Sequence, residues 1–259
     1  MKAKLSIVKI GGNIINDDQE LSNLLELFSK INRNKILVHG GGKKATEIGE
    51  KLGVVAKMVN GRRITNAESL DVAIMVYGGL LNKKIVAELQ AQDCNAIGMS
   101  GADGNAITAK KRPVGVIDFG LVGDVEKANS DTVSMLLKAD LTPTFCALTH
   151  NGKGQLLNTN ADTIAAELAI AMSSEFETTL YYCFEKKGVL QNIDDENSVI
   201  QHIDSKKYKS LLAEGIIAEG MLPKMHNCFH ALQQNVKQVC IGNSDMLQEE
   251  NSNFTTLTL

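Results

Sequence analysis

The chain has 259 residues, of which 44% are hydrophobic and 22% are charged, as in ordinary globular proteins. At this length a chain buries enough apolar surface to fold without disulfides or a structural metal. The formal net charge of −3 and the 4% of aromatic residues, with no tryptophan, argue against a nucleic-acid-binding surface. No run of about 18 apolar residues predicts a membrane span, and the short apolar run at the N-terminus is not typical of a signal peptide.

The cysteines argue against a disulfide framework and against a structural zinc site, because their number is odd and no C-x-x-C pair occurs. Free thiols in a reducing compartment fit this pattern, and we expect a cytoplasmic protein. The five cysteines are Cys94, Cys146, Cys183, Cys228 and Cys240.

Short β-branched runs alternate with longer segments of helical periodicity along most of the chain. This alternation predicts an α/β fold, a three-layer αβα sandwich whose open central sheet is mainly parallel. Residues 101–127 break the alternation, because Gly and Asp separate short apolar runs there, and we expect an antiparallel hairpin at the edge of the sheet. The expected strands cover residues 5–10, 35–39, 94–99, 142–147, 178–184 and 239–242, and the expected helices cover residues 18–31, 43–52, 67–91, 130–139, 161–173, 205–214 and 221–234.

One soft boundary, the segment 172–178, divides a single expected domain into two lobes. We expect the first lobe to comprise residues 1–173 and the second to comprise residues 174–259. The helix expected at 67–91 carries Gly78 and Gly79 at its centre. Each glycine costs about 1 kcal/mol relative to alanine inside a helix, so the pair predicts close packing there.

Two glycine-rich turns follow expected strands, at Lys9-Ile10-Gly11-Gly12-Asn13 and at His39-Gly40-Gly41-Gly42. In open α/β sheets, ligands bind beyond the carboxyl ends of the strands. Successive glycines allow backbone N–H groups to converge on an anion, and the N-terminus of the following helix adds to the attraction. One such turn is also typical of a plain strand-to-helix connection, but two of them predict an anion-binding site.

The second turn also satisfies the dinucleotide-binding pattern G-x-G-x-x-A, with Gly40, Gly42 and Ala45 between an expected strand and an expected helix. The acidic residue that should end the next strand is missing, since residues 59–63 read VNGRR. An NAD(P)-dependent oxidoreductase is therefore the weaker alternative. The chain contains no G-x-x-x-x-G-K-[ST] motif, so it is not expected to be a P-loop phosphotransferase.

Two further sets of polar residues have simple structural interpretations. His226 and His230 lie four residues apart on an expected helix, but no H-E-x-x-H pattern accompanies them and no third ligand is evident. We interpret them as a partly exposed pair rather than a metal site. Asp103, Asp118 and Asp124 lie in the region rich in Gly and Asp and are expected to be turn residues.

Nine segments in a fixed order resemble the amino acid kinase family, and within it the enzymes that act on N-acyl-glutamate. The resemblance extends from about Leu5 to Gly242. It rests on the combination of K-x-G-G, H-G-G-G, N-G-x-R-x-T, N-x-N-A-D and G-M-x-x-K, none of which is specific alone. The segments are VKIGGN (8–13), VHGGGKKATEI (38–48), NGRRIT (60–65), GLLNKKIV (79–86), GADG (101–104), GLVGDVEKAN (120–129), LLNTNADTIAAELA (156–169), KGVL (187–190) and EGMLPKM (219–225).

The resemblance implies transfer of the γ-phosphoryl group of ATP to the γ-carboxylate of N-acetyl-L-glutamate, in arginine biosynthesis. Mg²⁺ would be carried on the ATP phosphates, with no metal ligands supplied by the protein. A carboxylate with an ordinary pKa of about 4.3 is already ionised at neutral pH, so the reaction needs no general base. Cations and backbone donors must instead offset the charge of two meeting anions. N-succinyl-L-glutamate is the alternative substrate, for which Arg62 is a candidate cation.

The family's functional residues have counterparts at matching positions of this chain. Two lysines would flank the transferring phosphoryl group from opposite lobes, and an aspartate would hold both lysines in place as an acceptor. An arginine and an asparagine would bind the α-carboxylate of the substrate, and glycine N–H groups would contact the phosphoryl group and the substrate. The implied residues are Lys9, Asp162 and Lys224 for catalysis, Gly41, Gly42, Arg63 and Asn158 for the acyl-glutamate, and Gly12, Lys187, Gly188, Gly220 and Met221 for the phosphoryl group and nucleotide.

Several positions admit other interpretations or depart from the family pattern. Lys9 could be a surface lysine, and Asp162 could cap the helix expected at 161–173. Glu185 replaces the aspartate usual in the nucleotide-binding part, and Thr255-Thr256 replaces a Gly-Thr pair. A silent sensor on the same fold is a further alternative, but such a protein is expected to lack one of the catalytic residues, and all are present.

The partners expected are ATP, the acyl-glutamate and a second copy of the chain, with neither nucleic acid nor membrane. The helix at 67–91 is the expected dimer contact, because Gly78 and Gly79 permit close approach and the family's dimers use a central helix. Family members that arginine inhibits carry an extra N-terminal helix. At most four residues precede the first strand here, so we expect a homodimer that is insensitive to arginine.

Overall fold

A computed structural model of the chain describes residues 2–59, 61–217, 221–248, 250 and 253–259. The chain forms two compact units. Unit 1 combines the N-terminal segment up to Ile36 with the segment from Ala165 onward, and unit 2 comprises Leu37–Ile164. The boundary expected between residues 173 and 174 does not coincide with this division, because the N-terminal strand and helix belong to the same unit as the C-terminal part.

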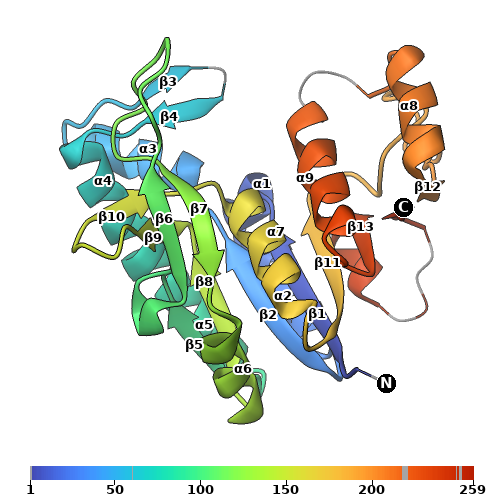
Figure 1. Ribbon diagram of the computed structural model, residues 1–259, viewed down its shortest axis with the longest axis horizontal. Helices are drawn as coiled ribbons and strands as arrows, with labels where there is room; N and C mark the ends of the chain where they lie inside the picture. The colour runs from blue at the N-terminus through green and yellow to red at the C-terminus, as the bar shows by residue number, and fades with distance from the viewer. Residues whose placement is uncertain (1, 60, 218–220, 249, 251–252) are drawn as a thin grey trace. The chain divides into compact units, whose positions relative to one another are not determined.

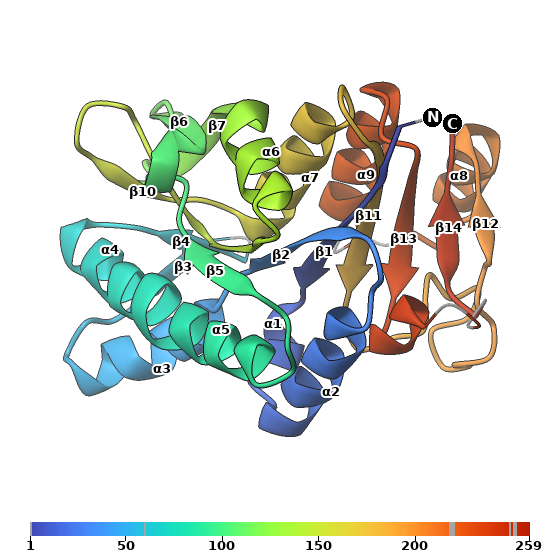
Figure 2. The ribbon, with the colours of Figure 1, turned by 90° about the horizontal axis from the view of Figure 1, so that it is seen from below.

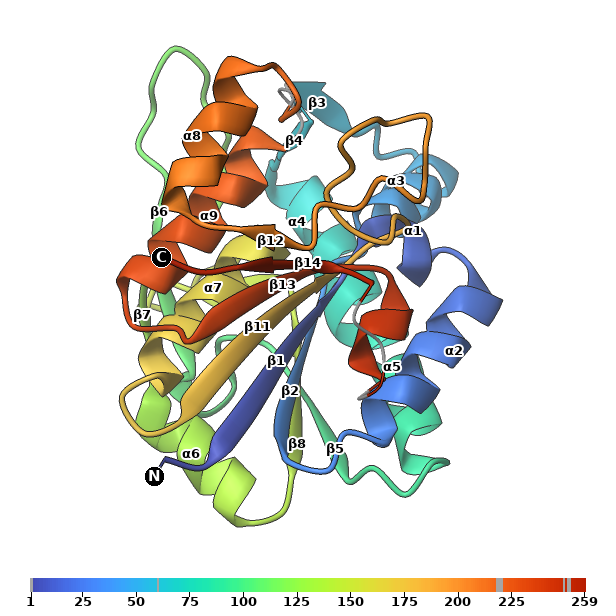
Figure 3. The ribbon, with the colours of Figure 1, turned by 90° about the vertical axis from the view of Figure 1, so that its right-hand side faces the viewer.

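The sheet of unit 1 has the strand order β12-β14-β13-β11-β1 (Figure 3). β1 pairs with β11 and β11 with β13 in parallel, so that Ile10, Cys183 and Gly242 end adjacent strands at the same level. β14 runs antiparallel to β13 and parallel to β12. The strands are β1 (Lys4–Ile10), β11 (Glu177–Cys183), β12 (His202–Ile203), β13 (Gln238–Gly242) and β14 (Thr255–Leu257).

Helices lie on both faces of this sheet, with α2 on one face and α9 on the other (Figure 2). α2 begins where Asp17 accepts hydrogen bonds from Gln19 and Glu20, and it buries Leu21, Leu24, Leu25 and Phe28. The helices are α1 (Gly12–Ile15), α2 (Asp18–Ser29), α8 (Ser205–Ala213), α9 (Leu222–Gln233) and the 3₁₀ turn η3 (Ser244–Leu247), together with the part of α7 (Ala161–Met172) that follows Ile164.

Unit 2 contains strands of three sheets. β2, β8 and β5 are parallel neighbours, and α5 and α6 lie on opposite faces of them (Figure 2). A second sheet has the order β10-β9-β6-β7, and β3 and β4 form an antiparallel hairpin (Figure 1). The strands are β2 (Asn34–His39), β3 (Lys57–Val59), β4 (Arg62–Ile64), β5 (Ala96–Met99), β6 (Ile107–Lys111), β7 (Gly123–Ala128), β8 (Thr142–Cys146), β9 (Leu148–His150) and β10 (Leu156–Asn158).

The remaining helices of unit 2 include one long helix with a π-helical centre. The periodicity over residues 67–91 is confirmed, but the segment around Gly78 and Gly79 is wider than an α-helix. Nineteen residues separate Leu70 from Leu89 over five apolar steps, about 3.8 per turn, and π turns accommodate a period above 3.6. The helices are α3 (Gly42–Lys51), α4 (Ala67–Ala73), the π segment η1 (Ile74–Leu81), α5 (Asn82–Gln90), the 3₁₀ turn η2 (Asp103–Asn105) and α6 (Ser130–Lys138).

The expected α/β class with a mainly parallel sheet and helices on both sides is confirmed. The expected hairpin is present as β6 and β7, but it belongs to the separate sheet with β9 and β10. The sequence pattern did not predict the strands β3, β4, β9 and β10. Each has three residues, too few for an alternation of polar and apolar residues to be recognised. No helix among the described residues combines the length and apolar character needed to cross a bilayer.

Candidate active site

The carboxyl edge of the unit 1 sheet carries the first predicted turn. Lys9 is half-buried near the end of β1, level with Tyr182 of β11. The backbone N–H of Gly11 donates to the carbonyl of Cys183 at 2.8 Å, which ties the turn to the end of β11. Gly12 is exposed at the first position of α1. Strand pairing thus places Lys9 and Gly12 at the edge where ligands bind in α/β sheets.

Lys224 belongs to the same edge of unit 1. It lies in the first turn of α9, and its Nζ lies 5.2 Å from the ring centroid of Phe184. Phe184 follows directly on β11, and its N–H donates to the carbonyl of Gly242 at 2.9 Å. The cation–π contact therefore brings the Lys224 ammonium to the end of the strand adjacent to β1. Lys9 and Lys224 are predicted to come from opposite lobes. In the structure both belong to unit 1.

The segment predicted to contact the nucleotide is fixed by Thr255. Its buried hydroxyl accepts from the N–H of Val189 at 2.8 Å and donates to the carbonyl of Ile200 at 2.7 Å. Lys187 and Gly188 directly precede this bridge. Glu185 is exposed, and the neighbouring Lys186 pairs instead with Glu196 at 2.9 Å. Met221 is half-buried before α9, whereas Gly220 lies outside the described residues.

The second glycine turn lies at the end of β2 in unit 2. Gly41 has φ +148°, a conformation that favours glycine. A Cβ at Gly41 would also collide with the side chain of Leu81 and lie 3.0 Å from the ring of Tyr77. Gly42 begins α3, and a Cβ at Gly40 would lie 3.8 Å from that of Ala161 at the start of α7. The turn is therefore packed between the long helix and α7.

His39 orients this turn from beneath. Its Nδ1 lies 2.9 Å from the carbonyl of Gly40, and the amide nitrogen of Asn82 lies 3.0 Å from its Nε2 and 2.9 Å from the carbonyl of Thr144. Burial lowers the pKa of His39 to about 4. The imidazole is therefore neutral at neutral pH, with Nδ1–H donating to Gly40 and Nε2 accepting from Asn82.

Arg63 extends from β4 toward the same turn. One Nη2 donates to the carbonyl of Gly42 at 2.8 Å and to Oγ1 of Thr46 at 2.7 Å. A guanidinium has five N–H donors, so these two bonds leave donors for a carboxylate. Arg62, which precedes it, is exposed.

Asn158 ends β10 and is joined to the segment that follows Arg63. Its amide donates to Oγ1 of Thr65 at 3.0 Å, and its N–H donates to the carbonyl of Leu121 at 3.0 Å. The N–H of Leu121 in turn donates to the carbonyl of Thr65 at 2.6 Å. The structure therefore brings Gly41, Gly42, Arg63 and Asn158 to connected segments of unit 2, as their shared predicted role requires.

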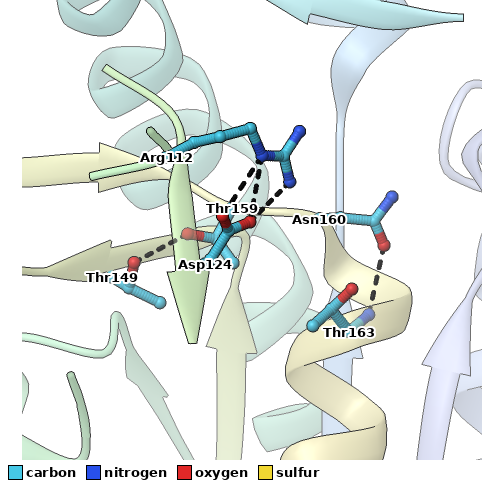
Figure 4. A network of polar contacts seen from close by, with 6 residues as sticks. All are labelled: Arg112, Asp124, Thr149, Thr159, Asn160 and Thr163. Atoms are coloured by element: carbon cyan, nitrogen blue, oxygen red, sulfur yellow. Dashed lines mark hydrogen bonds and ion pairs between the residues drawn. The ribbon is translucent and has the colours of Figure 1, made fainter. Parts of the chain in front are cut away.

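Asp162 occupies the second position of α7, and the helix cap is another residue. Oδ1 of Asn160 accepts from the N–H of Asp162 at 2.8 Å. It also accepts from the N–H of Thr163 at 3.1 Å (Figure 4). The interpretation of Asp162 as the N-cap is therefore wrong. The preceding Thr159 shares a buried hydrogen bond of 2.7 Å with Thr149 of β9, which fixes the approach to the helix (Figure 4).

Two of the three aspartates expected to be turn residues have that role. Asp103 accepts from the N–H and hydroxyl of Ser100, and Asp118 accepts from the N–H of Gly120. Asp124 instead lies within β7 and forms an ion pair with Arg112 at 2.6 Å (Figure 4). The turn prediction for Asp124 is wrong, because the cross-strand arginine makes a carboxylate favourable inside the hairpin.

The alternative sites receive no support. Residues 57–64 form a short antiparallel hairpin rather than the parallel strand of a dinucleotide-binding unit. His226 and His230 are exposed, and His230 lies 3.7 Å from Glu167. Within the described ranges, no group of three or more His, Cys, Asp and Glu residues is arranged to hold a metal ion. All five cysteines are buried free thiols.

Sequence reasoning missed residues that support the site from below. Tyr77, Asn82 and Thr255 have apolar or strand-like surroundings in the sequence, and only the fold shows what their polar atoms contact. His39 was noted as part of the glycine turn, but its tautomer depends on Asn82, 43 residues away.

The chain is similar to known proteins over nearly its whole length. Residues 4–243 match the amino acid kinase family. An acetylglutamate kinase from Phocaeicola vulgatus is 52% identical over 249 residues, which cover 96% of this chain and 97% of the relative. One from Bacteroides fragilis is 52% identical over 241 residues, covering 93% and 92%. The crystal structure of smu.665 from Streptococcus mutans UA159 shares the fold, with a TM-score of 0.78, 24% identity and 98% of both chains covered. The chain therefore belongs to the amino acid kinase family.

Proposed function

We propose that this protein is an acetylglutamate kinase, which phosphorylates the γ-carboxylate of N-acetyl-L-glutamate with ATP in arginine biosynthesis. The observation that carries the proposal is 52% identity to an acetylglutamate kinase over 96% of the chain. The glycine turns, the two lysines and Arg63 fit this reaction, because it joins two anions and needs cations and N–H donors rather than a base.

The roles of the individual residues are proposals. In unit 2, Arg63 and Asn158 bind the α-carboxylate, and the N–H groups of Gly41 and Gly42 hold the acyl-glutamate. The γ-carboxylate oxygen attacks the γ-phosphorus of ATP, the bond to the β-phosphate oxygen breaks, and ADP leaves with that electron pair.

Two lysines supply the positive charge for this step. Lys9 and Lys224 neutralise the charge that develops on the transferring group, and Gly12 donates its N–H to it. Lys187, Gly188, Gly220 and Met221 contact the nucleotide. The role of Asp162 toward the two lysines stays a prediction. Mg²⁺ would arrive on the ATP phosphates and would neutralise part of their charge. The described residues offer no carboxylate cluster for it.

N-acetyl-L-glutamate is favoured over the succinyl analogue as the substrate. The relatives that are about half identical to this chain are named acetylglutamate kinases. Arg62, the candidate cation for a succinyl carboxylate, is exposed on β4. The oxidoreductase alternative is not favoured by any of these relatives.

A homodimer in the cytoplasm completes the proposal. Met75 and Leu80 on the π segment are 52% and 38% exposed, and Gly79 beside them permits close approach of a second helix. Buried free thiols at all five cysteines suit a reducing compartment. The partners are small molecules and a second copy of the chain, without nucleic acid.

A coupled assay of ADP release tests the function. With N-acetyl-L-glutamate we expect turnover that requires both substrates, and kcat/KM at least about tenfold above that with N-succinyl-L-glutamate. Hydroxylamine traps the acyl phosphate product as a hydroxamate, which identifies the carboxylate as the phosphoryl acceptor. ADP release without hydroxamate would contradict the proposed acceptor, and preference for the succinyl analogue would contradict the proposed acyl group.

A further inference from the structure

The π segment of the long helix lies directly against the glycine turn. π-helical turns cost stability and occur frequently at functional sites, so their position is informative. Within this segment Tyr77 and Leu81 are the two side chains that a Cβ at Gly41 would meet. Tyr77 is only 4% exposed. The Tyr77 ring therefore packs against the glycine turn at Gly41.

The hydroxyl of Tyr77 reaches further than the ring, toward Gly42 and Arg63. A Cβ at Gly42 would lie 3.9 Å from the phenol oxygen. The phenol oxygen also lies near enough to the Arg63 guanidinium for the positive charge of Arg63 to act on the phenol. Gly42 is the residue whose carbonyl accepts from Arg63 Nη2 at 2.8 Å. The guanidinium is thus hydrogen-bonded to Gly42 and Thr46 of α3 and lies near the phenol of Tyr77 from the long helix.

The protonation state of Tyr77 suits an orienting role. Burial raises the pKa of the phenol above its ordinary value, while the positive charge of Arg63 acts in the opposite direction with smaller effect. The phenol therefore stays neutral at neutral pH. A neutral acceptor orients the guanidinium without cancelling its charge, which stays available to an anionic ligand.

We propose that Tyr77 is a positioning residue that fixes the Arg63 guanidinium for the α-carboxylate of the acyl-glutamate. This inference rests on the proposed function. A guanidinium binds a carboxylate best through two parallel N–H bonds, and this geometry is lost when the planar group rotates. Tyr77 acts by restricting that rotation, and the π segment is the structural device that brings its hydroxyl to the correct side.

The variant Tyr77→Phe separates orientation from packing, because it keeps the ring beneath Gly41 and removes only the hydroxyl. We expect KM for N-acetyl-L-glutamate to rise about 5- to 10-fold, as for loss of one polar contact with a charged group. KM for ATP and kcat should stay within about twofold of wild type. The melting temperature should stay within about 2 °C of wild type. Tyr208→Phe, in unit 1, removes the hydroxyl from a ring that stacks on Phe229 and serves as the matched control.

A double-mutant cycle tests whether Tyr77 acts through Arg63. In an Arg63→Lys background, which keeps a charge but lacks the planar fork, we expect Tyr77→Phe to change KM for the acyl-glutamate less than twofold. Additive effects of the two substitutions would overturn the positioning role, as would a rise in KM for ATP. Should the double variant turn over too slowly, titration calorimetry with N-acetyl-L-glutamate measures the same coupling as a ratio of Kd values.

The outcomes also distinguish this inference from the proposed function. If Arg63→Lys raises KM for the acyl-glutamate and Tyr77→Phe does not, the inference fails and the proposed substrate site stands. If Arg63→Lys leaves this KM unchanged, the proposed substrate site and the inference both fail. A lowered melting temperature in Tyr77→Phe with unchanged KM would assign the hydroxyl to stability alone.

Discussion

The side-chain amide of Asn82 lies 3.0 Å from Nε2 of His39, and both side chains are almost completely buried. This contact joins the first residue of α5 to the last residue of β2. It fixes which nitrogen of the imidazole carries the proton, because the amide donates to Nε2 and leaves Nδ1–H for the carbonyl of Gly40. The glycine turn therefore depends on a neutral histidine.

A neutral buried His39 predicts a loss of stability in acid. Its pKa is about 4 in the folded protein and 6.5 ordinarily, so the unfolded chain binds one more proton between these values. Stability from this group is full above pH 6.5, and about 2 kcal/mol of it is lost at about pH 5. Urea unfolding at about pH 7.5 and 5 measures the change.

The control for this prediction is an exposed histidine. His39→Gln removes the titration, so we expect its free energy of unfolding to fall less between the two pH values than that of wild type. His202→Gln should keep the wild-type difference, because His202 is exposed at the end of the sheet. Equal pH dependence in wild type and His39→Gln would show that His39 is not the titrating group.

The lysines of unit 1 are expected to act in the transition state. Lys9→Ala and Lys224→Ala should each lower kcat about 100-fold or more, because each removes a charge that stabilises the transferring phosphoryl group. Steady-state kinetics at saturating ATP measures the effect. Lys237 is an exposed lysine that precedes β13. Lys237→Ala is therefore the control and should keep wild-type kcat. A kcat near wild type in either test variant would remove that lysine from the catalytic set.

Arg63 is expected to contribute mainly to substrate binding. Arg63→Ala should raise KM for N-acetyl-L-glutamate about 30-fold or more and change KM for ATP less than threefold, since it binds the unreactive end of the substrate. Arg62→Ala is the matched control from the same strand and should have little effect. Loss of ATP affinity in Arg63→Ala would place this residue in the nucleotide site instead.

Thr255 is expected to hold the segment around Lys187 and Gly188 in place. Thr255→Val removes the hydroxyl and leaves the N–H of Val189 and the carbonyl of Ile200 without their partner, at a cost of about 1–3 kcal/mol. We expect KM for ATP to rise about fivefold and KM for the acyl-glutamate to stay constant. Thr255→Ser keeps the hydroxyl and should restore ATP binding; failure to do so would point to packing rather than the hydrogen bonds.

The exposed apolar side chains of the π segment predict the dimer contact. Met75→Glu should convert a particle of about twice 28.0 kDa into one of 28.0 kDa, because a carboxylate replaces an apolar group in the contact. Light scattering coupled to size exclusion measures the mass. Met135→Glu alters a methionine that is 62% exposed on α6 and should leave the dimer intact. A wild-type monomer would contradict the prediction directly.

Segments with a strong period could be predicted from the sequence, and short or irregular ones could not. Leu21, Leu24 and Phe28 mark α2 at helical spacing, and the structure has that helix. The hairpin around Arg63 has only three residues in each strand, too few for alternation to show. The π segment was concealed for another reason. The long helix has apolar steps of three and four residues, as an ordinary helix does, and only their sum shows the longer period.

In the candidate site, too, some residues could be predicted from the sequence and others could not. Glycines after strands, lysines and Arg63 carry a recognisable motif, whereas the groups that orient them are distant in the sequence. Asn160 illustrates the limit: Asp162 is one candidate N-cap of α7 in the sequence, although Asn160, two positions earlier, accepts both capping hydrogen bonds. Residue type alone cannot distinguish Asn160 from Asp162, because both are favourable N-cap residues. The backbone geometry decides between them.

The assembly of unit 1 from both ends of the chain has a consequence for synthesis on the ribosome. All of unit 2 emerges before β11, so unit 2 can fold while the edge of β1 that pairs with β11 is still open. β1 carries Leu5, Ile7, Val8 and Ile10, all completely buried in the finished protein. β1 is thus translated before unit 2 but completed only after it, and until then its unpaired edge needs protection from aggregation.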